Sequence, residues 1–158
     1  MNIQLTQKET LLLEDQKSHE ELCIKKYNSY ADQTQDPQLK QLFKKHAAQE
    51  QEHLASINQL LSGQIPNINQ QQGQQGQTQG QEATMTMSKG LGNNAADADL
   101  CQDLLMTEKY VSATYDTTIF EFTNAQAREV LNHIQKEEQQ HGEDIFNYMQ
   151  QHGMYQPK

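Results

Sequence analysis

Two four-residue stretches decide the fold of this chain: Glu50-Gln51-Glu52-His53 and Glu138-Gln139-Gln140-His141. Both read Glu-x-x-His, and on a helix this spacing places a carboxylate and an imidazole on one face, one turn apart. Either stretch alone is weak, because so short a pattern also occurs by chance. Their placement is more informative, since residues 50 and 138 are 88 positions apart and the chain aligns with itself at that offset.

The self-alignment reveals an internal repeat. Its most important match places Glu20 on Glu108, so that each half has a further glutamate ahead of its Glu-x-x-His stretch. Other identical pairs at the same offset are Leu12 and Leu100, Asp15 and Asp103, Tyr27 and Tyr115, Gln38 and Gln126, Gln51 and Gln139, and Ile57 and Ile145. The two halves therefore share acidic, aromatic and histidine positions.

Each half reads as a pair of helices joined by a tight turn. Thr6-Gln7-Lys8-Glu9 is a capping box and predicts a helix from about Gln7. Asp36-Pro37 predicts the start of the next helix, which we expect to end at Ser62-Gly63. The second half has corresponding signals: a helix start near Asp97, a turn at Thr123-Asn124 and a stop at Gly153.

These signals predict an all-α fold, in which two antiparallel helical hairpins form one four-helix bundle over residues 1–158. The hairpins span residues 6–63 and 95–155, and residues 64–94 join them. Gln70 to Gln81 is Gln and Gly apart from Thr78, too polar to form a core. We interpret this stretch as a crossover along the bundle, since roughly 30 residues at about 3.3 Å each easily span about 40 Å. A tether or polar adhesive is the alternative.

Composition excludes several classes of function. A net charge of −9 and a pI of about 5.0 argue against nucleic acid and against membrane surfaces. Because Met1 to Leu13 has no basic stretch followed by a long apolar run, we expect no signal peptide or transmembrane span. We predict that Cys23 and Cys101 are packed thiols, because both fall on apolar stripes and two distant cysteines suit a reducing cytosol.

The turns place the repeated glutamates at one height. Glu20 and Glu50 are equally distant from position 35, in one predicted turn, and Glu108 and Glu138 are equally distant from position 123, in the other. If the hairpins pair about a pseudo-twofold axis, these side chains meet in the core. The candidate metal site, which we call the hexad, consists of Glu20, Glu50, His53, Glu108, Glu138 and His141.

Four buried carboxylates need neutralisation by protons or cations, because the desolvation of each costs several kcal/mol. Two divalent ions would balance four negative charges, and carboxylates with imidazoles suit Fe or Mn, with Zn as a third choice, better than Ca or Mg. Di-iron and di-manganese bundles use one Glu from each of two helices and Glu-x-x-His from the others. We therefore predict a dinuclear metal site; a proton-sharing polar core is the alternative.

Residues near the hexad receive simpler interpretations. Tyr27 and Tyr115 are expected in the core, with a radical or hydrogen-bonding role as the alternative. Glu21 and Glu137 are expected to be solvated. The remaining histidines are expected at the surface or packed, and not as ligands: His19, His46, His133 and His152.

The hexad and its two motifs resemble the ferritin-like superfamily, which includes rubrerythrins, bacterioferritins and manganese catalases. The resemblance implies a ferritin-like bundle, and as one function a di-iron or di-manganese oxidoreductase acting on oxygen or peroxide; a storage cage is a weaker idea. If the chain is such an oxidoreductase, the resemblance implies that Glu50 and Glu138 bridge the metals. The other ligands are then terminal: Glu20, Glu108, His53 and His141.

A narrower likeness lies in the C-terminal half, which resembles the spore coat protein F family. It is carried by Asp103-Leu104-Leu105, Glu108-Lys109-Tyr110, Tyr115, Ala127 to Leu131, and Ile145 to Met149 through Gly153-Met154-Tyr155, where the family usually has Gly-Trp-Tyr. The likeness implies cytoplasmic synthesis in the mother cell, deposition in the spore coat and other coat proteins as partners; we also consider a homodimer. Our first hypothesis is a coat F-like structural protein that keeps the dinuclear site.

Overall fold

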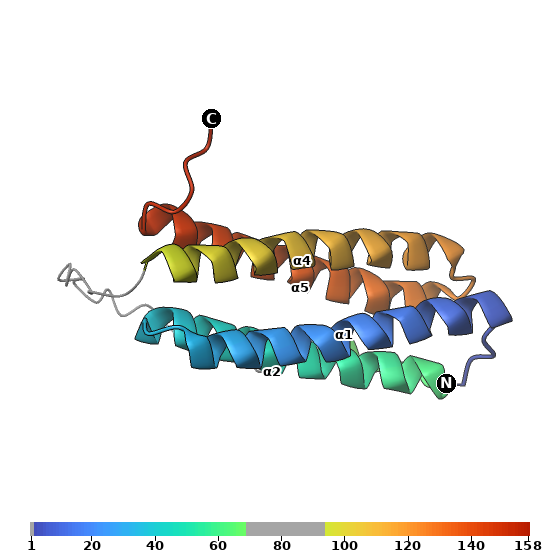
Figure 1. Ribbon diagram of the computed structural model, residues 1–158. Helices are drawn as coiled ribbons and strands as arrows, with labels where there is room; N and C mark the ends of the chain where they lie inside the picture. The colour runs from blue at the N-terminus through green and yellow to red at the C-terminus, as the bar shows by residue number, and fades with distance from the viewer. Residues whose placement is uncertain (1, 69–93) are drawn as a thin grey trace.

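The computed structural model describes residues 2–68 and 94–158. Within these ranges the chain forms four long helices: α1 (Gln7–Gln33), α2 (Pro37–Leu61), α4 (Asn94–Glu121) and α5 (Ala125–Gln151). Figure 1 shows them as two antiparallel hairpins lying lengthwise against each other. The predicted all-α bundle of two hairpins is confirmed, whereas the stretch from Gln70 to Gln81 lies outside the described residues. No helix in the described ranges is long and apolar enough to cross a bilayer.

The helix ends follow the local signals in the sequence. The Thr6 backbone N–H donates to Glu9 Oε2 at 2.7 Å, and the Glu9 N–H donates to Thr6 Oγ1 at 3.2 Å, which is the predicted capping box. Asp36 caps α2 by accepting from the Gln38 N–H. One boundary differs from expectation, because α4 begins at Asn94 and places Asp97 in its first turn.

Glu9 also joins the start of the first hairpin to the turn of the second. Its Oε1 accepts hydrogen bonds from the backbone N–H of Thr123 at 2.8 Å and from the Thr123 hydroxyl at 2.9 Å. Burial raises the pKa of Glu9, but the hydrogen bonds from Thr123 and Thr6 outweigh burial and leave the pKa below its ordinary value. Glu9 therefore stays ionised, and its carboxylate joins the N-terminus of α1 to the turn of the second hairpin.

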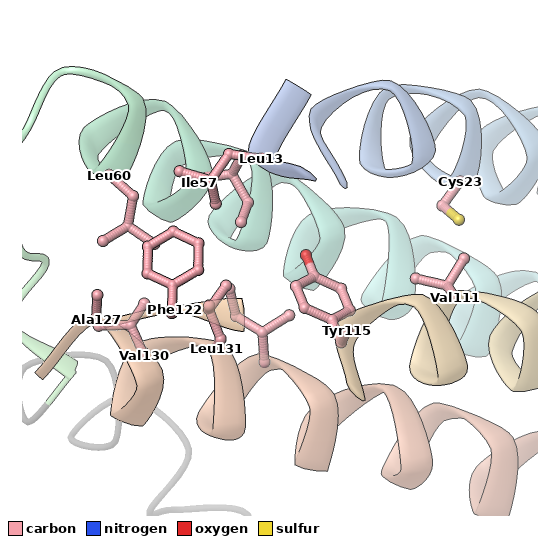
Figure 2. Packing of buried hydrophobic residues seen from close by; sticks show 11 residues of the cluster. Leu13, Cys23, Ile57, Leu60, Val111, Tyr115, Phe122, Ala127, Val130 and Leu131 are labelled. Carbon is pink, nitrogen blue, oxygen red and sulfur yellow. The ribbon is translucent and has the colours of Figure 1, made fainter. Parts of the chain in front are cut away.

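Two hydrophobic clusters pack the bundle on either side of the hexad, although Cys23 of the first cluster follows Glu20 in α1, on the side of Tyr27 in the second. The first, shown in Figure 2, consists of Leu13, Cys23, Ile57, Leu60, Val111, Tyr115, Phe122, Ala127, Val130, Leu131 and Ile134. The second consists of Tyr27, Ala31, Leu39, Phe43, Ala47, Cys101, Leu104, Ile145, Tyr148 and Met149. Both cysteines are free and buried, as predicted. The clusters place the middle of the bundle far from solvent.

Polar contacts fix how the hairpins face each other. Helix α1 packs against α4, and α2 packs against α5. Gln16 Nε2 donates to Thr118 Oγ1 at 3.1 Å, whereas Lys26 Nζ, further along α1, donates to Asp103 Oδ2 at 2.9 Å, earlier in α4. The order of these contacts shows that α1 and α4 run antiparallel.

The turn after α2 provides a test of the N-terminal packing. Gly63 has a φ of 80°, and a Cβ there would lie 2.8 Å from the Ile3 carbonyl oxygen, whereas Gly153 has a φ of 68° with nothing within 4 Å of its Cβ position. An L-residue in this region costs about 1 to 2 kcal/mol. We expect Gly63→Ala to lower the free energy of urea unfolding by at least about 1 kcal/mol more than Gly153→Ala, since only the former displaces Ile3. Equal losses would contradict this.

Candidate metal centre

All six residues of the hexad meet at mid-height in the bundle. One comes from α1 (Glu20), two from α2 (Glu50 and His53), one from α4 (Glu108) and two from α5 (Glu138 and His141), and each is at most 2% exposed. They form two groups, in each of which one ligand atom per residue lies within 4.8 Å of the others. The groups are Glu20, Glu50, His53 and Glu138, and Glu50, Glu108, Glu138 and His141.

The turns explain why the glutamates are level. Helix α1 ends at Gln33 and α2 begins at Pro37, so position 35 lies in the first loop; α4 ends at Glu121 and α5 begins at Ala125, so position 123 lies in the second. Residues equally distant from a turn face each other in an antiparallel hairpin. The helical period then directs the glutamates inward, because they lie on the same stripes as the buried apolar residues.

Both imidazoles direct Nδ1 toward the carboxylates. His53 Nδ1 lies 3.0 Å from Glu50 Oε2, 3.3 Å from Glu138 Oε1 and 3.8 Å from Glu20 Oε2. His141 Nδ1 lies 3.3 Å from Glu50 Oε1, 3.4 Å from Glu138 Oε2 and 3.5 Å from Glu108 Oε1. Glu50 and Glu138 thus contact both rings, whereas Glu20 and Glu108 each contact one.

The donor atoms of the hexad fit a pair of divalent ions. Among the described residues, the buried side-chain atoms that lack a hydrogen-bond partner include Glu20 Oε2, Glu50 Oε1, Glu108 Oε2, both carboxyl oxygens of Glu138 and His141 Nδ1. A buried polar atom left without a partner costs about 1 to 3 kcal/mol. These atoms belong to the two groups of potential ligands, and their carboxylate and imidazole chemistry suits Fe, Mn or Zn.

The pKa shifts within the hexad favour its neutralisation by protons. Burial and the charges of Glu138 and Glu50 raise the pKa of Glu20 well above its ordinary value, and burial with Glu138 raises the pKa of Glu108. Burial would also raise the pKa of Glu50, but the two adjacent imidazoles hold it at about 2. Although burial lowers the pKa of each imidazole, the surrounding carboxylates raise both. Protons on Glu20, Glu108 and both imidazoles would leave the six side chains without net charge.

Two tyrosines link the hairpins at the hexad. The Tyr27 hydroxyl donates to Glu108 and the Tyr115 hydroxyl donates to Glu20, so each tyrosine holds a glutamate of the other hairpin. Both tyrosines are fully buried, and burial together with the adjacent carboxylates raises their pKa well above 10. The predicted core position is confirmed, and the structure adds the hydrogen-bonding role.

A second layer holds the outer nitrogen of each imidazole. His53 Nε2 lies 2.7 Å from Glu137 Oε2, and His141 Nε2 lies 3.1 Å from Gln49 Oε1. The prediction that Glu137 is solvated is wrong, because its side chain is only 18% exposed. Position 137 lies at the edge of the inward face of α5, where His53 of α2 reaches it. The pattern of one helix does not reveal this contact.

The other histidines lie outside the two ligand groups, as predicted. His46 is fully buried, and its ring stacks on that of His141 with centroids 4.2 Å apart. Its Nε2 lies 3.1 Å from Asp144 Oδ2, while burial lowers the pKa of His46 to about 4, so the ring is neutral at pH 7. His46 therefore packs against one face of the His141 ring, a contact that its isolated place in the sequence did not indicate.

Comparisons with known proteins agree with this architecture. The family model of the Coat F domain matches residues 96–158, which include most of α4 and all of α5. No curated protein matches the chain.

One similar solved structure is a two-domain protein from Anabaena variabilis ATCC 29413 with DJ-1/ThiJ/PfpI-like and ferritin-like domains. The identity is 12%, the TM-score is 0.68, and the match covers 95% of this chain and 38% of that one. At this identity the likeness shows the fold alone. The resemblances inferred from the sequence are thus confirmed: residues 96–158 match the Coat F domain, and the chain folds as a ferritin-like four-helix bundle.

Proposed function

We propose that this protein is a structural component of the spore coat that holds two divalent metal ions in the core of its bundle. The main support for the metal site is that two buried groups of four potential ligands share Glu50 and Glu138. The Coat F match supports the coat role and association with other coat proteins. The metals proposed first are Fe and Mn, followed by Zn.

Each ion would have its own terminal ligands. Glu20 and His53 would bind only one ion, and Glu108 and His141 would bind only the other. Glu50 and Glu138, which belong to both groups, would be shared by the two ions. Two divalent ions would replace the protons that neutralise the four carboxylates. Because the ligands come from all four helices, bound ions would join the two hairpins and stabilise the folded bundle.

An oxidoreductase acting on oxygen or peroxide is the second candidate. The hydrogen bonds from Tyr27 and Tyr115 favour it, because they place protonated hydroxyls beside potential metal ligands. Bound metals would supply the redox chemistry, and the protein would set ligand geometry and exclude water. Catalase or peroxidase turnover that disappears in Glu50→Gln but survives in Glu52→Gln would favour this candidate.

Metal content tests the dinuclear site. We expect protein purified without chelator to contain two Fe or Mn ions per chain by elemental analysis. Glu50→Gln and Glu138→Gln should each lose most of the metal, because each removes a shared ligand. Glu52→Gln is the matched control, since it removes the same charge from an exposed position of α2. Metal at background level in the unaltered protein would leave only the proton-sharing core.

The pH dependence of stability tests the protonation of the metal-free hexad. Glu20, Glu108, His53 and His141 have raised pKa values in the folded protein, so the folded chain holds protons that the unfolded chain releases. Their stabilisation is complete below the unfolded values, 4.5 for Glu and 6.5 for His, and is lost as pH rises through the folded values.

We therefore expect the urea midpoint of metal-free protein to fall as pH increases above 6.5. The lowered pKa of His46 has the opposite effect, but only below pH 6.5. Saturating Mn²⁺ should reverse the trend, because binding requires deprotonated ligands. The double variant Glu20→Gln and Glu108→Gln should flatten the metal-free profile. A metal-free protein that gains stability above pH 6.5 would contradict the assignment.

Localisation tests the coat role. We expect the protein in coat extracts of purified spores, detected by immunoblot, and synthesis during sporulation. Accumulation only in vegetative cells would contradict this role. A homodimer stays a prediction, which sedimentation of the purified chain would test.

A further inference from the structure

The two halves of the hexad have different outer partners at equivalent positions. Residues 49 and 137 are 88 positions apart, which is the offset of the repeat. Gln49 accepts from His141 at 3.1 Å, whereas Glu137 accepts from His53 at 2.7 Å. The repeat thus provides an amide behind one imidazole and a carboxylate behind the other.

This difference matters because the outer nitrogen of a ligating imidazole carries the proton. With Nδ1 facing the carboxylates, Nε2–H donates outward, to Gln49 from His141 and to Glu137 from His53. A hydrogen bond to a carboxylate is stronger than one to an amide and makes the imidazole a better ligand. Outer partners of this kind typically change metal affinity by about 10- to 100-fold.

The next neighbours also differ between the two halves. Lys45 occupies the position equivalent to His133. His133 Nε2 lies 3.5 Å from Glu137 Oε1, whereas Lys45 Nζ lies 3.5 Å from Asp144 Oδ2. Asp144 bonds His46 at 3.1 Å, so its carboxylate reaches His141 only through the stacked His46 ring. Glu137 in contrast contacts the ligand ring itself.

We propose that the two metal positions are inequivalent and that the ion held by Glu20 and His53 binds first and more tightly. The ion held by Glu108 and His141 then binds second. Glu137 and Gln49 are positioning residues, since each acts on the metal through an imidazole. This inference rests on the dinuclear site proposed above. The ions that would bind are divalent first-row metal ions.

Titration of the metal-free full-length chain with Co²⁺ tests the inference, by calorimetry and by the visible absorption of the bound ion. We expect two steps whose affinities differ by about 10- to 100-fold. Glu108→Gln should keep the tight step, and Glu20→Gln should keep only the weak one. This pair of variants assigns each step to its half of the hexad.

The decisive experiment exchanges the outer partners of the imidazoles, Gln49 and Glu137. Glu137→Gln should weaken the tight step by about 10- to 100-fold, and Gln49→Glu should strengthen the weak step. The double variant keeps the net charge of the chain and should reverse the order, so that Glu20→Gln in that background retains the tighter step. Glu137→Asp should restore part of the affinity, and Glu129→Gln, an exposed change on α5, should leave both steps unaltered.

The outcomes separate this inference from the proposal on which it rests. Two bound ions with an isotherm unchanged in Glu137→Gln, or an order that the double variant does not reverse, would overturn the inequivalence and leave the dinuclear site in place. Fewer than two Co²⁺ ions per chain at saturation would overturn both. Two steps that respond in opposite directions to Glu137→Gln and Gln49→Glu would support both.

Discussion

The structure depends on the neutralisation of four carboxylates at the centre of a dry bundle. Glu20, Glu50, Glu108 and Glu138 are each at most 2% exposed. Their burial would be prohibitive if all four were ionised and uncompensated. Protons on Glu20, Glu108 and the two imidazoles would remove the net charge in one state, and two divalent ions would do so in another. The folded bundle is therefore coupled to whatever occupies its core, which links proton binding, metal binding and stability.

Local signals were sufficient to predict the hexad, whereas its second layer needed the structure. Two local features, the helical period and the sites of the two turns, determine where the two Glu-x-x-His motifs lie. Both features can be recognised in short stretches of sequence. Glu137 was misplaced because its partner is on another helix. The separation and rotation of α2 and α5 determine that contact, and neither quantity follows from the periodicity of α5. The stacking of His46 on His141 escaped prediction for the same reason.

The repeat keeps its identities in the hexad and its two tyrosines, whereas the residues behind the imidazoles differ. Glu20 and Glu108, and Tyr27 and Tyr115, are identical pairs that exchange hydrogen bonds across the hairpins. Gln49 and Glu137 are an unlike pair behind the imidazoles. A symmetric inner layer determines how many ions the core can balance, because the four carboxylates set the charge. An asymmetric outer layer can then distinguish the ions without altering that number.

The region that matches the Coat F domain contains only the second hairpin of the bundle. The matched region, residues 96–158, contains Glu108, Glu138 and His141, which are half of the hexad. The first hairpin provides the remaining three potential ligands, Glu20, Glu50 and His53, of which Glu20 also accepts the hydrogen bond from Tyr115. Neither hairpin alone brings together a complete four-residue ligand group, because each group takes residues from both. The first hairpin is thus what completes each group of four potential ligands.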